Sequence, residues 1–343
     1  MASSPYDLAA VARSPAWLAH RYDPTGDKIH FVHAPRETQR AATFLIDEYL
    51  PKADQPFVAD RRAALAAATP SAPIHFIFHS AYCCSTLLAR AFDVEGVATT
   101  LKEPVILNDI QGWQSRGGEP ARIAEALDSA LALLARPFAA GEQVIVKPSN
   151  LINPFAPAML AMRPEARALL LYAPLRVYLG SIAKKGMWGR LWVRELFVKL
   201  GRAGLLDYGF SSEEILRQTD LQIAAIGWLG QHRLFGQLAE RYLDRVRTLE
   251  SEAMLVRPGD SLHALSGLYG LALDKRAARD LAEGDAFTRH SKDGEKFVAA
   301  DRQAEQRDAA AIHAEEIDKV AVWAEAVAES AGQSLVLPAG LLD

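Results

Sequence analysis

The chain has few of the residues that mark a secreted or metal-stabilised protein. Only two of its 343 residues are cysteines, Cys83 and Cys84, and they are neighbours. Adjacent cysteines rarely form a disulfide with each other, because the bridge needs Cα atoms farther apart than one peptide allows without distortion. The sequence also has no C-x-x-C pair and no clustered His/Cys spacing typical of structural zinc sites. We therefore expect a reduced, cytoplasmic protein without a bound metal.

An excess of positive charge and a long apolar run are also missing. The 38 basic and 42 acidic residues give a net charge of −4, so no basic field indicates nucleic-acid binding. The apolar runs fall far short of a membrane span, and the first residues lack the basic and apolar regions of a signal peptide. We expect the partner to be a small-molecule acceptor rather than nucleic acid or membrane. The oligomeric state stays open.

Half of the residues are apolar, which is enough for a large core in one α/β domain or two smaller ones. Short apolar or alternating segments predict strands at residues 28–33, 74–79, 144–146, 168–172 and 245–250. Apolar residues at helical spacing predict helices at residues 121–135 and 220–243. Strands that alternate with helices predict an α/β fold with a central, mostly parallel sheet and helices on both faces.

Three parts of one domain are expected along the chain. Residues 1–70 are interpreted as an N-terminal cap region, with an amphipathic helix at residues 37–50 that ends before a proline. Residues 71–300 are interpreted as the α/β core. Residues 301–343 are expected to form a C-terminal surface helix and a tail, with a weaker strand candidate at residues 332–337.

The most informative segment is residues 74–90, which predicts a short apolar strand, a tight turn of small residues and the start of a helix. Backbone N–H groups at such a turn, together with the positive end of the helix dipole, form an anion site. Ser85 and Thr86 add two hydroxyl groups where the helix begins. The pattern G-x-x-x-x-G-K-[ST] is absent, which disfavours an ordinary ATPase or GTPase. The alternative is simple helix capping by Ser or Thr.

Residues 81–88, Ala-Tyr-Cys-Cys-Ser-Thr-Leu-Leu, resemble the loop P-[KR]-S-G-[ST]-T-x-L of the PAPS-dependent sulfotransferases (PAPS is 3′-phosphoadenosine 5′-phosphosulfate). The match is good at Ser85, Thr86 and Leu88. Tyr82 stands where the family has a basic residue that touches the transferring sulfuryl group, and Cys84 stands where the family has glycine. The resemblance therefore supports binding of a phosphosulfate better than fast transfer. It implies that PAPS contacts Cys83, Cys84, Ser85 and Thr86.

A second segment, residues 170–181, resembles the R-x-P-x-x-R-x-x-S region whose Arg and Ser hold the 3′-phosphate in that family. Arg176 and Ser181 match, although Tyr172 replaces the leading arginine and the spacing differs by about one residue. A guanidinium suits this task because it can donate two parallel hydrogen bonds to phosphate oxygens. The alternative is an ordinary surface arginine.

A third segment, residues 287–294, resembles the late basic loop that closes over the same phosphate, with Arg289 and Lys292 as the candidate ligands. A polar loop with Arg, Lys and Gly is common, so the interpretation rests on the position of this segment, which follows the other two in the chain. The resemblance covers roughly residues 74–292 in the family's order. It implies a P-loop, sulfotransferase-like fold and PAPS as co-substrate.

Four residues are candidates for the chemistry. Glu103, before a proline, is the first choice for the base that accepts the acceptor's proton. Lys147 ends a predicted central strand, where ligands bind in open α/β sheets, and substitutes for the missing loop lysine. His79, at the end of the strand, and Tyr82, in the loop, are also candidates for contact with the ligand. Three of them have a structural alternative: a solvated turn residue for Glu103, a hydrogen-bonded strand end for His79, and a residue that only closes the pocket for Tyr82.

These observations favour a sulfotransferase-like enzyme that transfers a sulfuryl group from PAPS to a hydroxyl or amine without a metal. A P-loop small-molecule kinase is the second interpretation, although the loop lysine it needs is missing. A non-catalytic nucleotide-binding protein that has lost the transfer chemistry is the third, and Tyr82 in the basic position supports it.

Overall fold

The computed structural model describes residues 6–52, 56–69, 72–284, 287 and 299–342. The described strands are β1 (Trp17–Asp23), β2 (Lys28–His33), β3 (Phe57–Asp60), β4 (Ile74–His79), β5 (Ala98–Lys102), β6 (Gln143–Lys147), β7 (Ala168–Tyr172) and β8 (Val246–Glu250). The described helices are α1 (Leu8–Arg13), α2 (Arg36–Ala41), α3 (Arg61–Ala67), α4 (Ser85–Ala91), α5 (Val105–Ser115), α6 (Pro120–Leu134), the 3-10 helix η1 (Asn150–Phe155), α7 (Ala156–Met162), α8 (Leu175–Lys184), α9 (Gly186–Arg202), α10 (Ser212–Arg217), α11 (Asp220–Arg241), α12 (Ser251–Val256), α13 (Pro258–Tyr269), α14 (Lys275–Glu283) and α16 (Ala299–Ser330).

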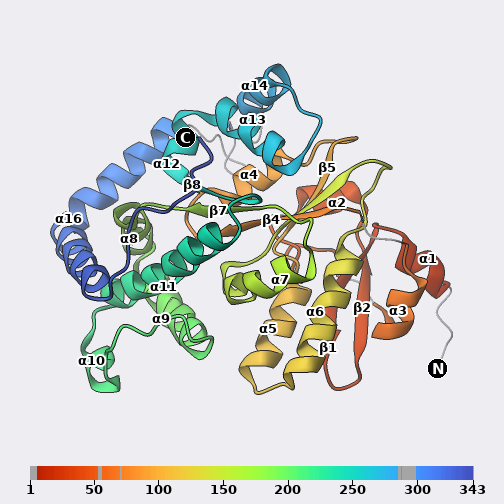
Figure 1. Cartoon of the computed structure of the whole chain (residues 1–343), viewed down its shortest axis with the longest axis horizontal. Coiled ribbons are helices and arrows are strands. Elements are labelled where there is room, and N and C mark those ends of the chain that lie inside the picture. The colour runs from red at the N-terminus through yellow and green to blue at the C-terminus, as the bar shows by residue number, and fades with distance from the viewer. Residues whose placement is uncertain (1–5, 53–55, 70–71, 285–286, 288–298, 343) are drawn as a thin grey trace. The chain divides into compact units, whose positions relative to one another are not determined.

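Five strands form a parallel sheet in the order β5-β6-β4-β7-β8, flanked by helices (Figure 1). Lys102 of β5 pairs with Lys147 of β6, and Tyr172 of β7 pairs with Glu250 of β8. Every residue of β4 is buried, as expected for an apolar strand in the middle of a covered sheet. The predicted α/β fold with a central parallel sheet is confirmed.

The direction of the chain across this sheet changes at β4 and β6. The chain leaves β4 toward the β5 edge, whereas it leaves β6 toward β7 on the other side of β4. Right-handed crossovers that run in opposite directions cover opposite faces of a sheet. The crossovers that follow β4 and β6 therefore cover opposite faces of this sheet.

The contacts of the described chain divide it into two compact units, of which the first comprises residues 1–77, 86–167 and 268–273. It contains an antiparallel sheet in the order β1-β2-β3, and α5 packs against both β1 and α6. A buried ion network supports it: Arg36 donates to Glu142 at 2.5 Å and to Asp93 at 3.1 Å. Because both carboxylates accept from one buried guanidinium, the charges in this network are paired.

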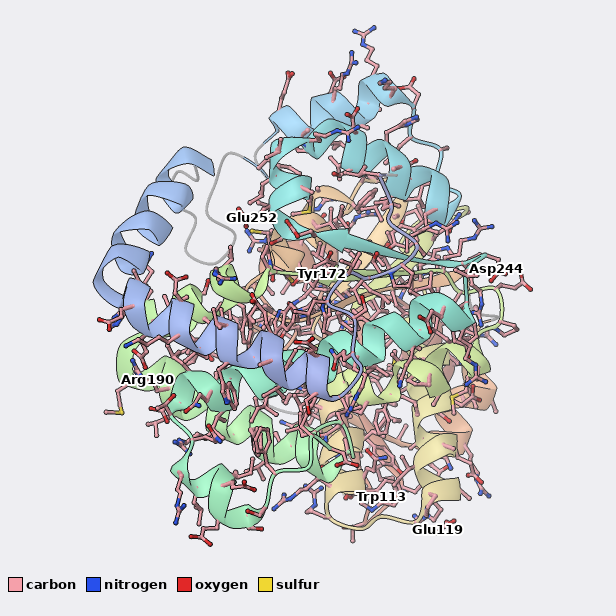
Figure 2. All side chains as sticks on the ribbon, turned by 60° about the vertical axis from the view of Figure 1, so that its left-hand side comes forward. Trp113, Glu119, Tyr172, Arg190, Asp244 and Glu252 are labelled. Atoms are coloured by element: carbon pink, nitrogen blue, oxygen red, sulfur yellow. The ribbon has the colours of Figure 1, made fainter. Side chains whose placement is uncertain are left out.

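The second unit comprises residues 78–85, 168–267 and 274–343. Its longest buried element is α11, which begins with a capping box formed by Thr219 and Gln222 and packs against α8, α9 and α16. Figure 2 shows α16 crossing the face of this unit with Arg190 beside it. Arg190 of α9 pairs with Glu316 of α16 at 3.2 Å, which fastens the long helix to the rest of the unit.

Two predicted elements are wrong. The helix expected at residues 37–50 ends at Ala41, because Leu45 instead donates its N–H to the Lys102 carbonyl at 2.7 Å and accepts the Val105 N–H at 3.1 Å. Residues 332–337 form no strand, and the β-bridge in this region joins Thr248 to Gly340. The division into cap, core and C-terminal parts stays a prediction. No helix of the described residues combines the length and apolarity needed to cross a bilayer.

Candidate active site

The loop after β4 has an unusual backbone for its sequence. Ala81, Tyr82 and Cys84 have φ angles of +72°, +53° and +61°, which lie in the left-handed region. This conformation costs about 1–2 kcal/mol for each residue that is not glycine. Cys84 stands where the sulfotransferase loop pattern has glycine, and its backbone adopts the conformation that glycine adopts readily. Strain of this kind is concentrated at ligand-binding and catalytic sites.

Hydrogen bonds hold the entrance to this loop. Ser80 donates its N–H to the Leu171 carbonyl at 3.1 Å, and its hydroxyl oxygen accepts the Ala173 N–H at 3.1 Å. The Nδ1 atom of His79 accepts the Ala81 N–H at 3.1 Å, so Nδ1 carries no proton. One nitrogen of the buried His79 ring therefore supports the loop backbone. Its predicted catalytic role remains a prediction.

Tyr82 faces aromatic neighbours. Its ring centroid lies 5.9 Å from that of Tyr178 and 5.4 Å from that of Trp192. Burial raises the pKa of the Tyr82 phenol well above its ordinary value, so the hydroxyl stays neutral. The loop position that carries a cation in the sulfotransferase pattern thus carries a neutral hydroxyl here.

Lys147 brings a cation to the first turn of α4. Its side chain is 1% exposed and forms an ion pair with Glu103. Its Nζ lies 3.5 Å from the hydroxyl oxygen of Thr86 and 5.1 Å from the centroid of the Phe44 ring. Ser85 and Thr86 are both buried at the start of the helix. A lysine, a carboxylate and a hydroxyl therefore meet beside the segment that was predicted to bind an anion.

The sheet register explains why Glu103 and Lys147 meet. Lys102 pairs with Lys147 across β5 and β6, so Glu103 is the first residue beyond that pair. The Glu103 N–H donates to the Lys147 carbonyl at 2.7 Å, and Glu103 has a φ of +53°. The sequence predicted both residues as candidates, but not that they form a pair.

Sequence reasoning missed Lys102. Its side chain is 1% exposed, and its Nζ donates to the Arg40 carbonyl at 2.7 Å. The pKa of Lys102 is lowered to about 7, chiefly by burial and also by the positive charges of Arg90 and Lys147, against the opposing effect of Asp93. The only signal in the sequence was a lysine at the end of the short segment Ala98–Lys102. The structure shows that this segment is a fully buried strand.

Two of the residues predicted to hold the 3′-phosphate, Arg176 and Ser181, have partners within the protein. Arg176 is half-exposed on α8 and pairs with Asp318 at 3.1 Å and with Glu325 at 3.0 Å, both on α16. The Ser181 hydroxyl donates to the Val177 carbonyl one turn earlier, at 2.9 Å. Two further candidates lie outside the described residues: Arg289 and Lys292. Of the two loop thiols, that of Cys83 is buried and that of Cys84 is partly exposed.

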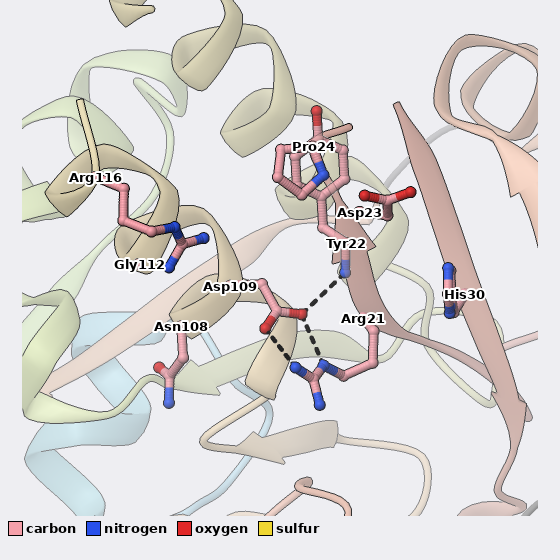
Figure 3. A pocket seen from close by; sticks show the side chains of 9 residues that line it. All are labelled: Arg21, Tyr22, Asp23, Pro24, His30, Asn108, Asp109, Gly112 and Arg116. Atoms are coloured by element: carbon pink, nitrogen blue, oxygen red, sulfur yellow. Dashed lines mark hydrogen bonds and ion pairs between the residues drawn. The ribbon is translucent and has the colours of Figure 1, made fainter. Parts of the chain in front are cut away.

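A polar cavity of about 500 Å³ in the first unit was also missed (Figure 3). Arg21 of β1 donates two hydrogen bonds of 2.8 Å to Asp109 of α5, and Asp109 also accepts the Tyr22 N–H at 3.0 Å. Asn108 and Arg116 of the same helix line the cavity. Among the residues with described side chains, no group of three or more His, Cys, Asp or Glu is arranged to hold a metal ion.

Comparisons with known proteins give likenesses in structure but not in sequence. No protein-family model matches the sequence, and no curated protein matches it. The chain is similar in structure to the sulfotransferase STF9 from Mycobacterium avium, with 14% sequence identity and a TM-score of 0.42. The similarity covers 74% of this chain and 78% of that one.

Proposed function

We propose that this protein is a sulfotransferase that transfers a sulfuryl group from PAPS to a hydroxyl or amine of a small-molecule acceptor. The observation that carries the proposal is the position of the Lys147 ammonium, which contacts Thr86 and pairs with Glu103. Thr86 follows the strained loop directly in the chain and belongs to the part that resembles the sulfotransferase loop. Two further features support an anion there: the left-handed backbone and the buried Ser85 at the start of the helix.

Each residue has a distinct role in the proposed transfer. The N–H groups of the loop and the hydroxyls of Ser85 and Thr86 hold phosphate oxygens. PAPS supplies the activated sulfuryl group and leaves as adenosine 3′,5′-bisphosphate. Lys147 neutralises the negative charge that develops on the departing bridging oxygen. Glu103 accepts the proton of the acceptor while the new S–O or S–N bond forms and the S–O bond to the bisphosphate breaks.

One observation favours a second candidate, a binding protein without transfer activity. Tyr82 is packed between Tyr178 and Trp192 and stays neutral, so the loop itself offers no cation to the sulfuryl group. If Lys147 does not compensate, the protein binds the nucleotide without transferring the group. The two candidates differ only in turnover, because both require the bisphosphate site.

The proposal is tested by calorimetric titration of the purified chain with adenosine 3′,5′-bisphosphate beside ATP–Mg²⁺. The double variant Ser85→Ala/Thr86→Ala removes the hydroxyls, and Lys319→Ala is a control on the exposed face of α16. Binding of the bisphosphate that the double variant weakens and Lys319→Ala leaves intact supports the PAPS site. Preference for ATP–Mg²⁺ favours a kinase instead, and the absence of binding to either ligand overturns the proposal.

A further inference from the structure

Helix α9 has apolar residues on two faces, of which one packs against α8 and α11 (Figure 1). The buried residues of that face are Gly189, Val193, Leu196 and Leu200. Met187, Leu191 and Val198 lie along another face, since intervals of four and seven residues return to the same side of a helix. Their side chains are 71%, 58% and 50% exposed, and that of the adjoining Trp188 is 61% exposed. These four residues form an outer patch of apolar side chains in contact with solvent.

An outer patch of this composition is unusual for a helix at the surface of a protein. Such a helix normally has one apolar face toward the core and a polar face toward water, and a helix that is apolar all round is normally covered on all sides. Among the described helices and strands, α8 and α11 make the main contacts with α9, and both lie on its buried face. Exposed apolar side chains that gather in one place mark surfaces that bind another protein or a membrane.

Positive charge surrounds the outer patch. Residues 184–202 contain six basic residues and one acidic residue, whereas the rest of the chain, with 32 basic and 41 acidic residues, has a net charge of −9. Two of the six are held within the protein, because Arg190 pairs with Glu316 and Arg194 pairs with Asp220. The other four are Lys184, Lys185, Lys199 and Arg202, of which only Lys199 is half-buried and the rest are exposed. The surroundings of the patch therefore favour an anionic partner.

The combination of aromatic, aliphatic and basic residues is typical of the boundary between a bilayer and water. The ammonium of Lys185 lies 5.2 Å from the centroid of the Trp188 ring. Tryptophan is enriched at the level of the lipid headgroups, and lysine can lay its stem on apolar surface while its charge stays in water. A second copy of the chain is a poorer partner. A twofold contact places the same surface of both copies together, which would bring the basic residues against one another.

We infer that the outer patch of α9 docks the protein onto an anionic lipid surface. Its apolar side chains enter the boundary between headgroups and acyl chains, and the basic residues around them lie beside the lipid phosphates. The lack of a long apolar run excludes only a helix that spans a bilayer, and a helix that lies on the surface needs none. The inference does not rest on the proposed function, since none of these residues belongs to the loop after β4 or to the pair of Lys147 and Glu103.

The test is co-sedimentation of the full chain with lipid vesicles. One set of vesicles consists of phosphatidylcholine alone, and the other of phosphatidylcholine mixed with phosphatidylserine, which is anionic. We expect tighter binding to the mixed vesicles, because basic residues near a membrane are attracted to anionic headgroups. The preference should weaken as the salt concentration rises, because salt screens this attraction.

The apolar contribution is tested with Met187→Gln/Leu191→Gln, which keeps two residues of good helix propensity and removes the apolar contact. Binding to the mixed vesicles should weaken at least about tenfold, since less apolar surface leaves water. Val256→Gln/Val322→Gln is the matched control, because it makes the same kind of change at exposed positions of α12 and α16. This control should bind as the wild type does.

The charged contribution is tested with Lys199→Gln/Arg202→Gln, which should weaken binding to the mixed vesicles about tenfold and leave binding to phosphatidylcholine alone unchanged. Lys275→Gln/Arg276→Gln, at exposed positions of α14, is the control of equal charge. Thermal unfolding confirms that each variant folds.

Four outcomes would overturn the inference. They are no binding to the mixed vesicles, equal binding to both kinds of vesicle, and equal losses in the test and control variants. The fourth is a dimer, detected by analytical ultracentrifugation without lipid, that Met187→Gln/Leu191→Gln dissociates, because the outer patch would then be an interface between two copies.

Discussion

Glu103 is joined to Lys147 through both its backbone and its side chain. Its N–H donates to the Lys147 carbonyl at 2.7 Å, and its carboxylate pairs with the ammonium of the same residue. The backbone bond fixes the distance between the two strand ends, so the ion pair does not depend on a flexible side chain finding its partner. A lysine held in this way is already oriented before any ligand binds.

Removal of the ammonium should separate binding from chemistry. Lys147→Ala is expected to lower sulfuryl transfer from PAPS by about a hundred- to thousandfold, the usual effect of losing one charge-stabilising group. Binding of adenosine 3′,5′-bisphosphate should remain measurable by calorimetry, because the loop and the hydroxyls remain. Lys319→Ala, at an exposed pair with Glu315, is the matched lysine control. Unchanged turnover in Lys147→Ala would contradict the assigned role.

The same pair predicts a non-additive effect on stability. Lys147→Met leaves the Glu103 carboxylate without its cation and is expected to lower the free energy of unfolding by about 3 kcal/mol, since breaking a buried pair is strongly destabilising. The double variant Lys147→Met/Glu103→Gln should lose less than the single one. Urea denaturation of the four proteins of this cycle measures the coupling. Additive losses would show that the two charges do not interact.

The strained loop predicts a stabilising effect of glycine. Cys84 has a φ of +61°, so Cys84→Gly should relieve about 1–2 kcal/mol of backbone strain, partly offset by about 0.4–1 kcal/mol of added entropy in the unfolded chain. Cys84→Ala removes the same thiol but keeps the strain, and it is the control. We expect Cys84→Gly to unfold at higher denaturant concentration than Cys84→Ala. A glycine variant that is no more stable than the alanine variant would contradict the predicted backbone strain at Cys84.

Lys102 predicts a pH dependence. Its pKa is lowered from 10.5 to about 7 in the folded protein, so between these pH values the unfolded chain binds one more proton than the folded one. Stability contributed by this group therefore rises with pH in that interval, with a slope of at most about 1.4 kcal/mol per pH unit. Lys102→Met should lose this slope, whereas Lys28→Met, at a half-exposed lysine, should keep it. Urea denaturation across the interval measures both, and parallel curves for wild type and Lys102→Met would refute the shift.

Arg176 predicts a gain of affinity. If it binds the 3′-phosphate, its pairs with Asp318 and Glu325 compete with the ligand. Exposed pairs contribute about 0–1 kcal/mol each, so removing both with Asp318→Asn/Glu325→Gln should tighten bisphosphate binding by at most about thirtyfold. Glu315→Gln/Glu329→Gln changes the charge of α16 equally without touching Arg176, and calorimetry compares the two. Equal affinities of both double variants would remove Arg176 from the site.

The sequence predicted several strands well because they carry local signals. The bounds of β2, β4 and β7 coincide with the predicted ones, since each is an apolar or alternating run bounded by polar or turn-forming residues. The helix expected at residues 37–50 failed for a non-local reason. Leu45 bonds to the backbone on both sides of Glu103, and such a contact between distant segments has no periodicity to detect.

The sequence singled out Glu103 and Lys147 as separate candidates but could not predict that they form a pair. Glu103 and Lys147 each follow from their place near the end of a strand, whereas their pairing needs the order of strands β5 and β6 in the sheet. Lys102 was missed because a buried lysine contradicts the pattern from which burial is inferred. The bulge at His20 was missed, because nothing in the sequence marks the shift of one residue in the alternation of β1.

The conformation of the loop after β4 depends on its surroundings. Ala81, Tyr82 and Cys84 do not favour a left-handed backbone, and contacts such as the hydrogen bond from the Ala81 N–H to His79 maintain it. The unfolded chain does not keep this conformation, so it has no comparable binding site for an anion. Ligand binding and folding are then thermodynamically linked, and an anion that occupies the loop should raise the melting temperature in proportion to the logarithm of its concentration above Kd. The melting curve thus becomes a screen for the ligand that needs no knowledge of the acceptor.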